Sequence, residues 1–186
     1  MMRMEGEDGV AAITLLVYTQ YLFQAFFTGF SIGVAPVFSY YYGSGNRQRL
    51  ARLFGISVRS VLAGSAGVFL IMELFAPWMV AVFAPPPSPV YDIAVGGIRI
   101  YSTAYLFYGT NVFTSALFTA LSNGKLSALV SLLRTLVFLL LGVFAFSSLF
   151  GATGIWMAGP FAEAVTVVWS LLFLKCRGAQ YGYLHP

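Results

Sequence analysis

The stretch LSALVSLLRTLVFLLLGVFAF, residues 126–146, contains 21 residues of which one, Arg134, is charged. A helix needs about 20 apolar residues to cross the hydrocarbon core of a bilayer, so this stretch predicts a transmembrane helix. A β-barrel strand is disfavoured because the stretch shows no alternation of apolar and polar residues. The rest of the chain contains further long apolar stretches of this kind.

Four further apolar stretches flank the first, and turn residues separate all five. The separators are GSGN at 43–46, PPPSP at 85–89, SNGK at 122–125 and FGATG at 150–154. Clusters of glycine, proline, serine and asparagine are typical of turns, and short turns join antiparallel neighbours. We therefore expect an all-α bundle over residues 10–177. Its five transmembrane helices are expected at about 10–42, 52–82, 90–121, 126–148 and 153–175.

The composition excludes whole classes of protein. The 186 residues are 59% hydrophobic and only 9% charged, whereas about a quarter of the residues in a soluble domain are charged. We therefore expect the lipid bilayer as the surroundings and neither a soluble enzyme nor an enzyme of any other kind. The net charge of +4 lies in short loops and forms no basic stripe of the kind that nucleic acid requires. A single Cys176 and a single His185 offer no disulfide and no metal cluster.

The basic residues between the expected helices predict the orientation. Those in the loops after the first and third helices and in the tail would all lie on one side of the membrane: Arg47, Arg49, Arg52, Lys125, Lys175 and Arg177. Basic loops stay in the cytoplasm. We thus expect a multi-pass protein of the plasma membrane (the inner membrane of a bacterium), with an acidic extracytoplasmic N-terminus at residues 1–9 and a cytoplasmic tail at 178–186. An outside N-terminus without a signal peptide indicates a longer protein with an upstream helix, the alternative being unaided translocation.

Polar side chains recur on two expected helix faces. Gln20 and Gln24 are four residues apart, and a similar spacing on the third helix relates Tyr101, Tyr105, Tyr108, Asn111 and Ser115. Residues three or four apart share one helix face. Each face has two interpretations, a wall of a polar substrate cavity or hydrogen bonding between helices. The sequence leaves both open.

A few residues within the apolar runs carry charge or change the backbone. Glu163 lies in the first half of the last helix, where a carboxyl group is by default a candidate for binding a proton or a cation, the alternative being a structural hydrogen bond. Arg99 and Arg134 are expected to have structural roles, with Arg134 extending toward the cytoplasmic surface. Pro36 and Pro160 remove backbone donors and are candidate kinks or hinges.

Four segments resemble the C-terminal lobe of the multidrug and toxic compound extrusion (MATE) transporters. The abundance of small residues and methionine is most similar to the prokaryotic branch of that family. They are GFSIGVAPVFSYYYGSGNRQRL at 29–50, LFAPWMVAVFAPPPSPVYDIAVGGIRIYS at 74–102, FTALSNGKLSALVSLLRT at 118–135 and GATGIWMAGPFAEAV at 151–165. Each is weak alone, but their order and spacing cover nearly the whole chain. Arg99, Arg134 and Glu163 stand at positions of these motifs, while the glutamine and tyrosine faces do not depend on the resemblance.

The resemblance implies two six-helix lobes around a central cleft that exchange a drug or organic cation for protons or sodium by alternating access. No cofactor is expected, and the coupling ion would be H⁺ or Na⁺. Matched to that plan, this chain supplies five helices of the second lobe and is expected to need the missing N-terminal lobe, or a homodimer partner, for efflux. Two alternatives stay open. One is a non-transporting accessory or truncated membrane protein. The other is a relative of the lipid-linked sugar flippases, although such a cavity would hold more cationic residues.

Overall fold

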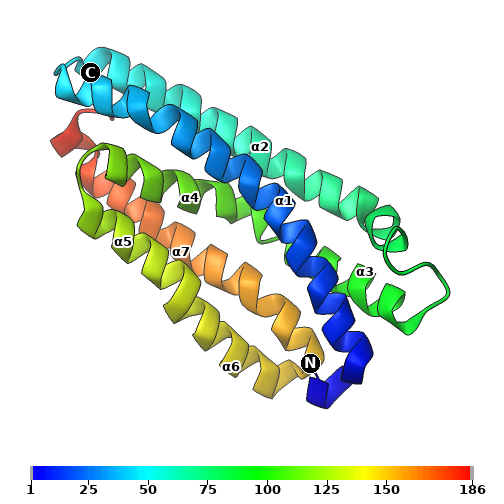
Figure 1. The fold of residues 1–186 in the computed structure, drawn as a ribbon. Coiled ribbons are helices and arrows are strands. Elements are labelled where there is room, and N and C mark those ends of the chain that lie inside the picture. The colour runs from blue at the N-terminus through cyan, green and yellow to red at the C-terminus, as the bar shows by residue number, and fades with distance from the viewer. Residues whose placement is uncertain (1, 185–186) are drawn as a thin grey trace.

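The computed structural model describes residues 2–184, and these residues form helices and turns without any strand. Met1, His185 and Pro186 lie outside the described part of the chain. The prediction of an all-α fold is confirmed (Figure 1). The elements are α1 (Met2–Gly43), α2 (Arg47–Ala81), α3 (Pro89–Ser102), α4 (Tyr105–Ala120), α5 (Gly124–Leu132), the π-helix η1 (Leu133–Phe138), α6 (Leu139–Phe150) and α7 (Ala152–Tyr181).

Four segments of the described chain are long and apolar enough to cross a membrane: Glu5–Gly43, Arg47–Ala81, Gly124–Phe150 and Ala152–Tyr181. Their outer surfaces carry large apolar side chains, such as Trp78, which is 76% exposed, and Phe144, which is 72% exposed. Soluble monomers rarely expose wide apolar surfaces of this kind. The outside of the bundle is therefore suited to hydrocarbon rather than to water.

The expected third helix, residues 90–121, is divided in the structure into α3 and α4. The Ser102 hydroxyl donates to the carbonyl of Arg99 at 2.6 Å, and the Thr103 hydroxyl donates to that of Ile100 at 2.8 Å. Such bonds to the preceding turn compete with the backbone N–H groups and bend or end a helix. α3 has 14 residues and α4 has 16, so neither alone reaches the roughly 20 residues of a span.

Three of the expected turns begin a helix through a polar side chain. Asn46 accepts a hydrogen bond from the N–H of Arg49 at 3.1 Å, and Ser88 accepts one from Tyr91 at 3.2 Å. Asn123 opens α5 in the same way. Because these oxygens satisfy N–H groups that have no partner within the helix, they fix where α2, α3 and α5 begin.

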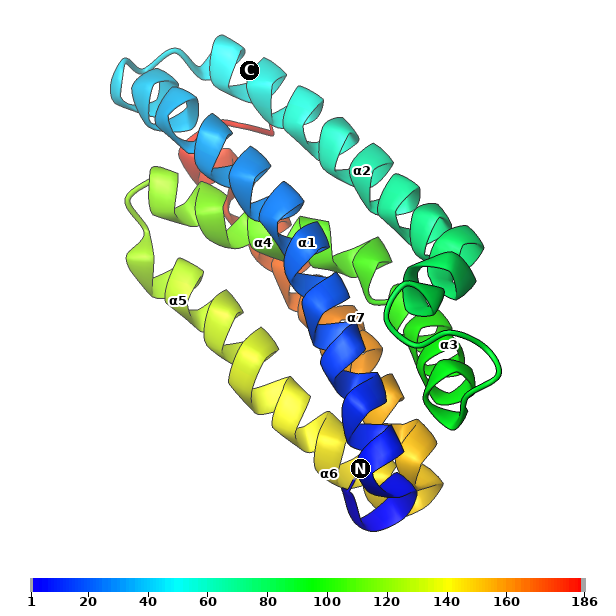
Figure 2. The same cartoon turned by 45° about the vertical axis from the view of Figure 1, so that its right-hand side comes forward.

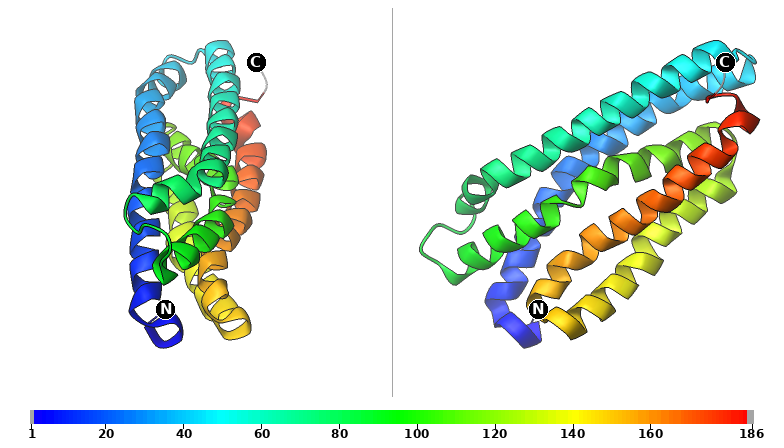
Figure 3. Two further views of the ribbon diagram at one scale, coloured as in Figure 1. Left: turned by 90° about the vertical axis from the view of Figure 1, so that its right-hand side faces the viewer. Right: turned by 180° about the vertical axis from the view of Figure 1, so that it is seen from behind.

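The helices surround α4. α1 and α2 run antiparallel along one side of the bundle, and α5, η1, α6 and α7 form the other side (Figures 1 and 2). α4 packs against α1, α2, α5 and α7. The α1–α2 turn, the α4–α5 turn and the end of α7 lie at one end of the molecule (Figure 3), so the structure gathers the basic loop residues at that end.

The buried side chains form two apolar clusters along the bundle. The first, toward α3, includes Met72, Ile98, Tyr105 and Trp156. The second, toward the basic end, includes Phe38, Phe113, Leu117 and Tyr183. On α4, residue Asn111 lies between the parts that belong to each cluster, and it is 1% exposed. A polar site therefore occupies the middle of the bundle.

Candidate functional site

A line of buried polar side chains runs along α7. Glu163 is 7% exposed, and Thr166 and Ser170 are fully buried. These three residues recur every three or four positions, so they share one helix face. Burying polar groups in an apolar bundle is costly unless each finds a partner. The Thr166 hydroxyl donates to the carbonyl of Ala162 within α7, and the partners of Glu163 and Ser170 come from α4 and η1.

Asn111 of α4 joins two of these α7 residues. Its amide nitrogen donates to the Oε2 atom of Glu163 at 2.7 Å and to the backbone oxygen of the same residue at 3.0 Å. Its amide oxygen accepts a hydrogen bond from the Ser170 hydroxyl at 2.7 Å. One carboxylate oxygen is thus held in place, and the other remains free to face the cavity described below.

Arg134 approaches Glu163 from the π-helix η1. One terminal nitrogen of Arg134 lies 3.8 Å from Oε1 of Glu163, which is an ion pair too long for a hydrogen bond. The guanidinium carbon also lies 4.8 Å from the centre of the Tyr108 ring, a cation–π distance. Short π-helical turns are frequent at functional sites. The wide spacing leaves Glu163 able to accept another partner on this side.

A small cavity of about 110 Å³ opens between these groups. One water takes up about 30 Å³ of liquid volume, so the cavity is sized for a few waters or an ion. Drug-sized pockets measure about 300–1,000 Å³. The residues that line it come from α1, α3, α4, η1, α6 and α7: Gln20, Gln24, Tyr101, Tyr108, Arg134, Thr135, Leu139, Gly159, Ala162 and Glu163.

Gly159 lets an aromatic side chain reach the cavity. A Cβ atom at this position would collide with the ring of Tyr101. The Tyr101 hydroxyl in turn accepts a hydrogen bond from the side-chain amide of Gln20. Because Gly159 lies one turn before Glu163, the close approach joins α1 and α3 to the same face of α7 that carries the carboxylate.

The structure brings four of the six predicted binding residues to this cavity: Gln20, Gln24, Tyr108 and Glu163. Arg134, for which the sequence predicted a structural role near the surface, also lines it. The other two predicted residues do not line it. Asn111 lies outside the cavity wall and donates a hydrogen bond to the Glu163 carboxylate.

Tyr105 is the second of these, and it lies in the apolar cluster toward α3 with 1% of its surface exposed. Its ring packs against Phe23 at a centroid distance of 5.6 Å. Tyr105 and Tyr108 both belong to α4, where three residues turn the helix by about 300°, so the Tyr105 side chain points about 60° away from that of Tyr108 and packs on Phe23 instead of lining the cavity.

The three remaining predicted residues lie away from the cavity. Arg99 is exposed in the last turn of α3, and Pro36 is exposed within α1 without ending that helix. Pro160 is half-buried within α7 and lines a separate shallow pocket. The structural role predicted for Arg99 and the hinge roles predicted for the two prolines stay predictions.

The residues of the site that the sequence reasoning missed include Thr135, Gly159 and Ser170. Ser170 had a signal, since it continues the spacing that begins at Glu163. Gly159 and Thr135 had none, because their positions depend on how α3 and η1 pack against α7. The π-helix itself has no pattern in the sequence that the periodicity argument could detect.

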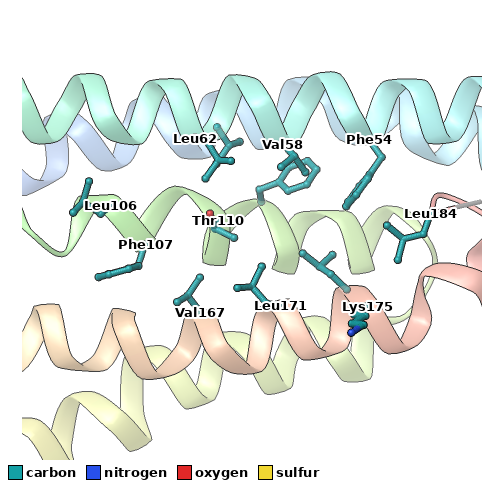
Figure 4. A pocket seen from close by; sticks show the side chains of 13 residues that line it. Phe54, Val58, Leu62, Leu106, Phe107, Thr110, Val167, Leu171, Lys175 and Leu184 are labelled. Atoms are coloured by element: carbon teal, nitrogen blue, oxygen red, sulfur yellow. The ribbon is translucent and has the colours of Figure 1, made fainter.

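A larger cavity of the bundle lies elsewhere and has a different character. It is a groove of about 520 Å³ between α2, α4 and α7, lined by apolar side chains such as Val58, Leu106 and Leu171 (Figure 4). Only Thr110 and Lys175 add polar groups. Binding sites normally combine apolar walls with a few convergent polar groups, and two polar residues in an otherwise apolar wall offer little to orient a polar ligand.

Comparison with known proteins identifies the fold. The structure matches solved transporters over 97% of its length at a TM-score of 0.88. One is described as MATE in complex with MaL6, at 21% identity, and another as an outward-facing multidrug resistance MATE family transporter of the MOP superfamily, at 20% identity. A MOP superfamily transporter from Pyrococcus furiosus, whose binding pocket is described as having reverse polarity, matches at a TM-score of 0.87 and 20% identity over 97% of this chain.

The chain spans 41% of the length of each of these three transporters. No curated protein sequence matches it. The prediction that the chain has the fold of one lobe of these transporters is confirmed by the structural matches. The MatE family model matches residues 1–162. Since this match covers most of the chain, the protein belongs to the MatE family of membrane transporters.

Proposed function

We propose that this chain forms part of a multidrug exporter that exchanges organic cations for protons or sodium by alternating access. The observation that carries the proposal is the buried carboxylate of Glu163, held by Asn111 and open on its other side to an ion-sized cavity. Ionisable residues within membrane spans are costly and mark ion pathways. Glu163 would take up the coupling ion, and Arg134 would compensate its charge when the ion leaves.

The size of the cavity indicates that the ion and the drug would bind at different places in such an exporter. At about 110 Å³ the cavity holds an ion but no drug. The drug would therefore bind where this bundle faces further helices, supplied by a longer polypeptide, a partner or a second copy. Rocking of two such bundles about a midplane site is the usual transporter mechanism. We expect the chain alone, in vesicles, to export nothing.

Efflux measurements test the role of Glu163. Ethidium export would be followed in membrane vesicles that contain the assembled transporter, with an imposed pH gradient or an imposed sodium gradient. Glu163→Gln should abolish the response to one of the two gradients, because the amide cannot take up a proton or pair with a cation. The matched control is Asp92→Asn, which alters an exposed acidic residue in the first turn of α3. An unchanged response of Glu163→Gln to both gradients would sink the coupling role.

One observation favours a second candidate, a flippase for lipid-linked anions. Arg134 places a cationic group in the wall of the cavity beside Tyr108, and a guanidinium is suited to binding phosphate. The same vesicles distinguish the two functions. Transbilayer movement of a fluorescent lipid diphosphate that depends on Arg134, without any ethidium export, would replace the drug-exporter proposal.

The orientation follows from the basic end of the bundle. We propose that this end faces the cytoplasm, because positively charged loops stay inside. Cys176 is the only cysteine of the chain, is exposed, and stands between Lys175 and Arg177 near this end. A membrane-impermeant maleimide should label it in inside-out vesicles and leave it unlabelled in right-side-out vesicles. The reverse labelling would invert the topology.

A further inference from the structure

A groove on the outer surface of the bundle separates α2 from α7. Both helices pack against α4, but in the described part of the chain they do not pack against each other. The apolar groove of about 520 Å³ lies in this gap, with α4 as its floor (Figure 4). Leu62 on one wall and Leu171 on the other are 53% and 55% exposed, so the groove opens to the surroundings of the bundle. It shares no lining residue with the Glu163 cavity.

The groove is elongated and runs along the helices. Leu106 and Phe107 line one end, and Lys175 and Leu184 line the other (Figure 4). The wall that α7 contributes extends from Val167 to Lys175, which is about 12 Å of helix at a rise of 1.5 Å per residue. Helices that cross a bilayer run in the same general direction as its acyl chains. The shape and direction of the groove therefore suit an extended acyl chain.

The charged end of the groove is built by the chain that follows α7. The Tyr183 hydroxyl donates to the carbonyl of Leu174 at 2.8 Å, which holds this segment against the helix it has just left. Gly178 provides the room, because a Cβ atom there would collide with the Leu184 side chain. Leu184 thus forms the wall at this end of the groove, beside the exposed ammonium group of Lys175.

The positive charge around Lys175 is not balanced within the chain. Lys175 has no carboxylate at ion-pair distance in the described residues, among which Arg134 and Glu163 form the one ion pair. None of the six acidic residues of the sequence belongs to the basic end of the bundle. They lie in the first turns of α1 and α3, in the last third of α2 and in the first half of α7: Glu5, Glu7, Asp8, Glu73, Asp92 and Glu163. Basic residues without acidic neighbours at a membrane surface attract anionic lipid headgroups.

We propose that the groove binds one acyl chain of an anionic phospholipid from the surrounding bilayer, with the lipid phosphate at Lys175. The ammonium group pairs with the phosphate as a point charge, and the apolar walls take up the chain. An empty groove would leave its lining side chains without contact partners on one side, and the acyl chain restores those contacts. The bound lipid thereby joins α2 to α7, which do not pack against each other. This inference does not depend on the transport function proposed above.

Photo-crosslinking of the full chain in lipid nanodiscs tests the proposal. Anionic phosphatidylglycerol and neutral phosphatidylcholine would each carry the same diazirine-bearing acyl chain, and mass spectrometry would locate the labelled residues. Phosphatidylglycerol should label the groove about fivefold more than phosphatidylcholine does, which is the contribution of one basic residue to binding an anionic headgroup. Equal labelling by the two lipids would overturn the proposal. Labelling of the outer surface that spares the groove would also overturn it, because a second copy or another protein segment would then cover the groove.

Two pairs of variants test the two parts of the site. Lys175→Gln should remove the preference for phosphatidylglycerol, whereas Lys125→Gln, at an exposed position of the basic end outside the groove, should keep it. Leu171→Trp places a large ring in the groove and should reduce its labelling several-fold. Leu172→Trp is the matched control, because Leu172 is also exposed but does not line the groove. A preference that survives in Lys175→Gln, or equal labelling of the groove in the two tryptophan variants, would contradict the assignment.

Discussion

Two faces of α4 are held by different forces. One carries Asn111, which donates a hydrogen bond to Glu163, and Tyr108, whose ring lies against the Arg134 guanidinium. The opposite face carries Thr110 and Leu106, which line the apolar groove toward α2 and α7 (Figure 4). Hydrogen bonds and ion pairs require particular geometries, whereas apolar contacts accept many. The polar face should therefore be sensitive to substitution and the groove face tolerant.

The largest effect is expected from breaking the ion pair on one side. Arg134→Leu leaves the carboxylate of Glu163 in the bundle without a compensating charge. Removing one partner of a buried pair costs about 3–5 kcal/mol, and the 17% exposure of the Arg134 side chain places this case near the lower limit. The free energy of unfolding, measured by denaturant titration in detergent micelles, should therefore fall by about 3 kcal/mol.

A double variant checks the cause of that loss. Arg134→Leu combined with Glu163→Leu removes both charges and should recover most of the stability, because replacing a buried pair by apolar residues is often neutral. Arg99→Leu is the control for losing an exposed arginine and should change stability by no more than about 0.5 kcal/mol. If the double variant is as unstable as Arg134→Leu alone, packing rather than charge holds this face.

The second-largest effect is expected at Asn111, which joins Glu163 and Ser170 on the polar face of α4. Asn111→Leu leaves both the Glu163 carboxylate and the Ser170 hydroxyl without the partners they have now. Each buried polar group left unsatisfied costs about 1–3 kcal/mol, so denaturation should show a loss within that range or above it. A loss smaller than about 0.5 kcal/mol would mean that water or a rearranged Arg134 replaces the amide.

The contrast between the two faces also shows what the sequence could reveal. Helix positions and turns were predictable because apolar runs and caps such as Asn46 and Asn123 act locally. Glu163 and Gln20 were recognisable as polar residues within apolar runs. Their partners were not, because the contact of Asn111 with Glu163 depends on how far α4 is rotated against α7.

The break between α3 and α4 limited the prediction in a second way. Ser102 and Thr103 are compatible with a continuous helix, and only their bonds to the preceding turn divide it. Tyr101, in the last turn of α3, reaches the cavity, whereas Tyr105, at the start of α4, packs in the apolar cluster. The periodicity argument holds within an element, and nothing local in the sequence marked where this element ends.

A smaller effect is expected from the contact between Gln20 and Tyr101 in the wall of the small cavity. Gln20 donates to the Tyr101 hydroxyl across α1 and α3. Gln20→Leu, Tyr101→Phe and the double variant form a cycle whose coupling free energy should be about 0.5–1.5 kcal/mol, the net value of one hydrogen bond. Additive losses in unfolding experiments would show that the two side chains do not depend on each other.

The smallest effect is expected one residue from Asn111, on the groove face. The Thr110 side chain lines the groove, and its backbone oxygen, which accepts the Thr114 hydroxyl at 2.7 Å, is unaffected by a change of side chain. Thr110→Val keeps the shape and removes one hydroxyl, so stability should change by no more than about 0.5 kcal/mol. Asn111→Leu in the same helix turn is the matched comparison. A loss for Thr110→Val as large as that for Asn111→Leu would mean that the groove contains a polar partner, and the division of α4 into a directional and a tolerant face would fail.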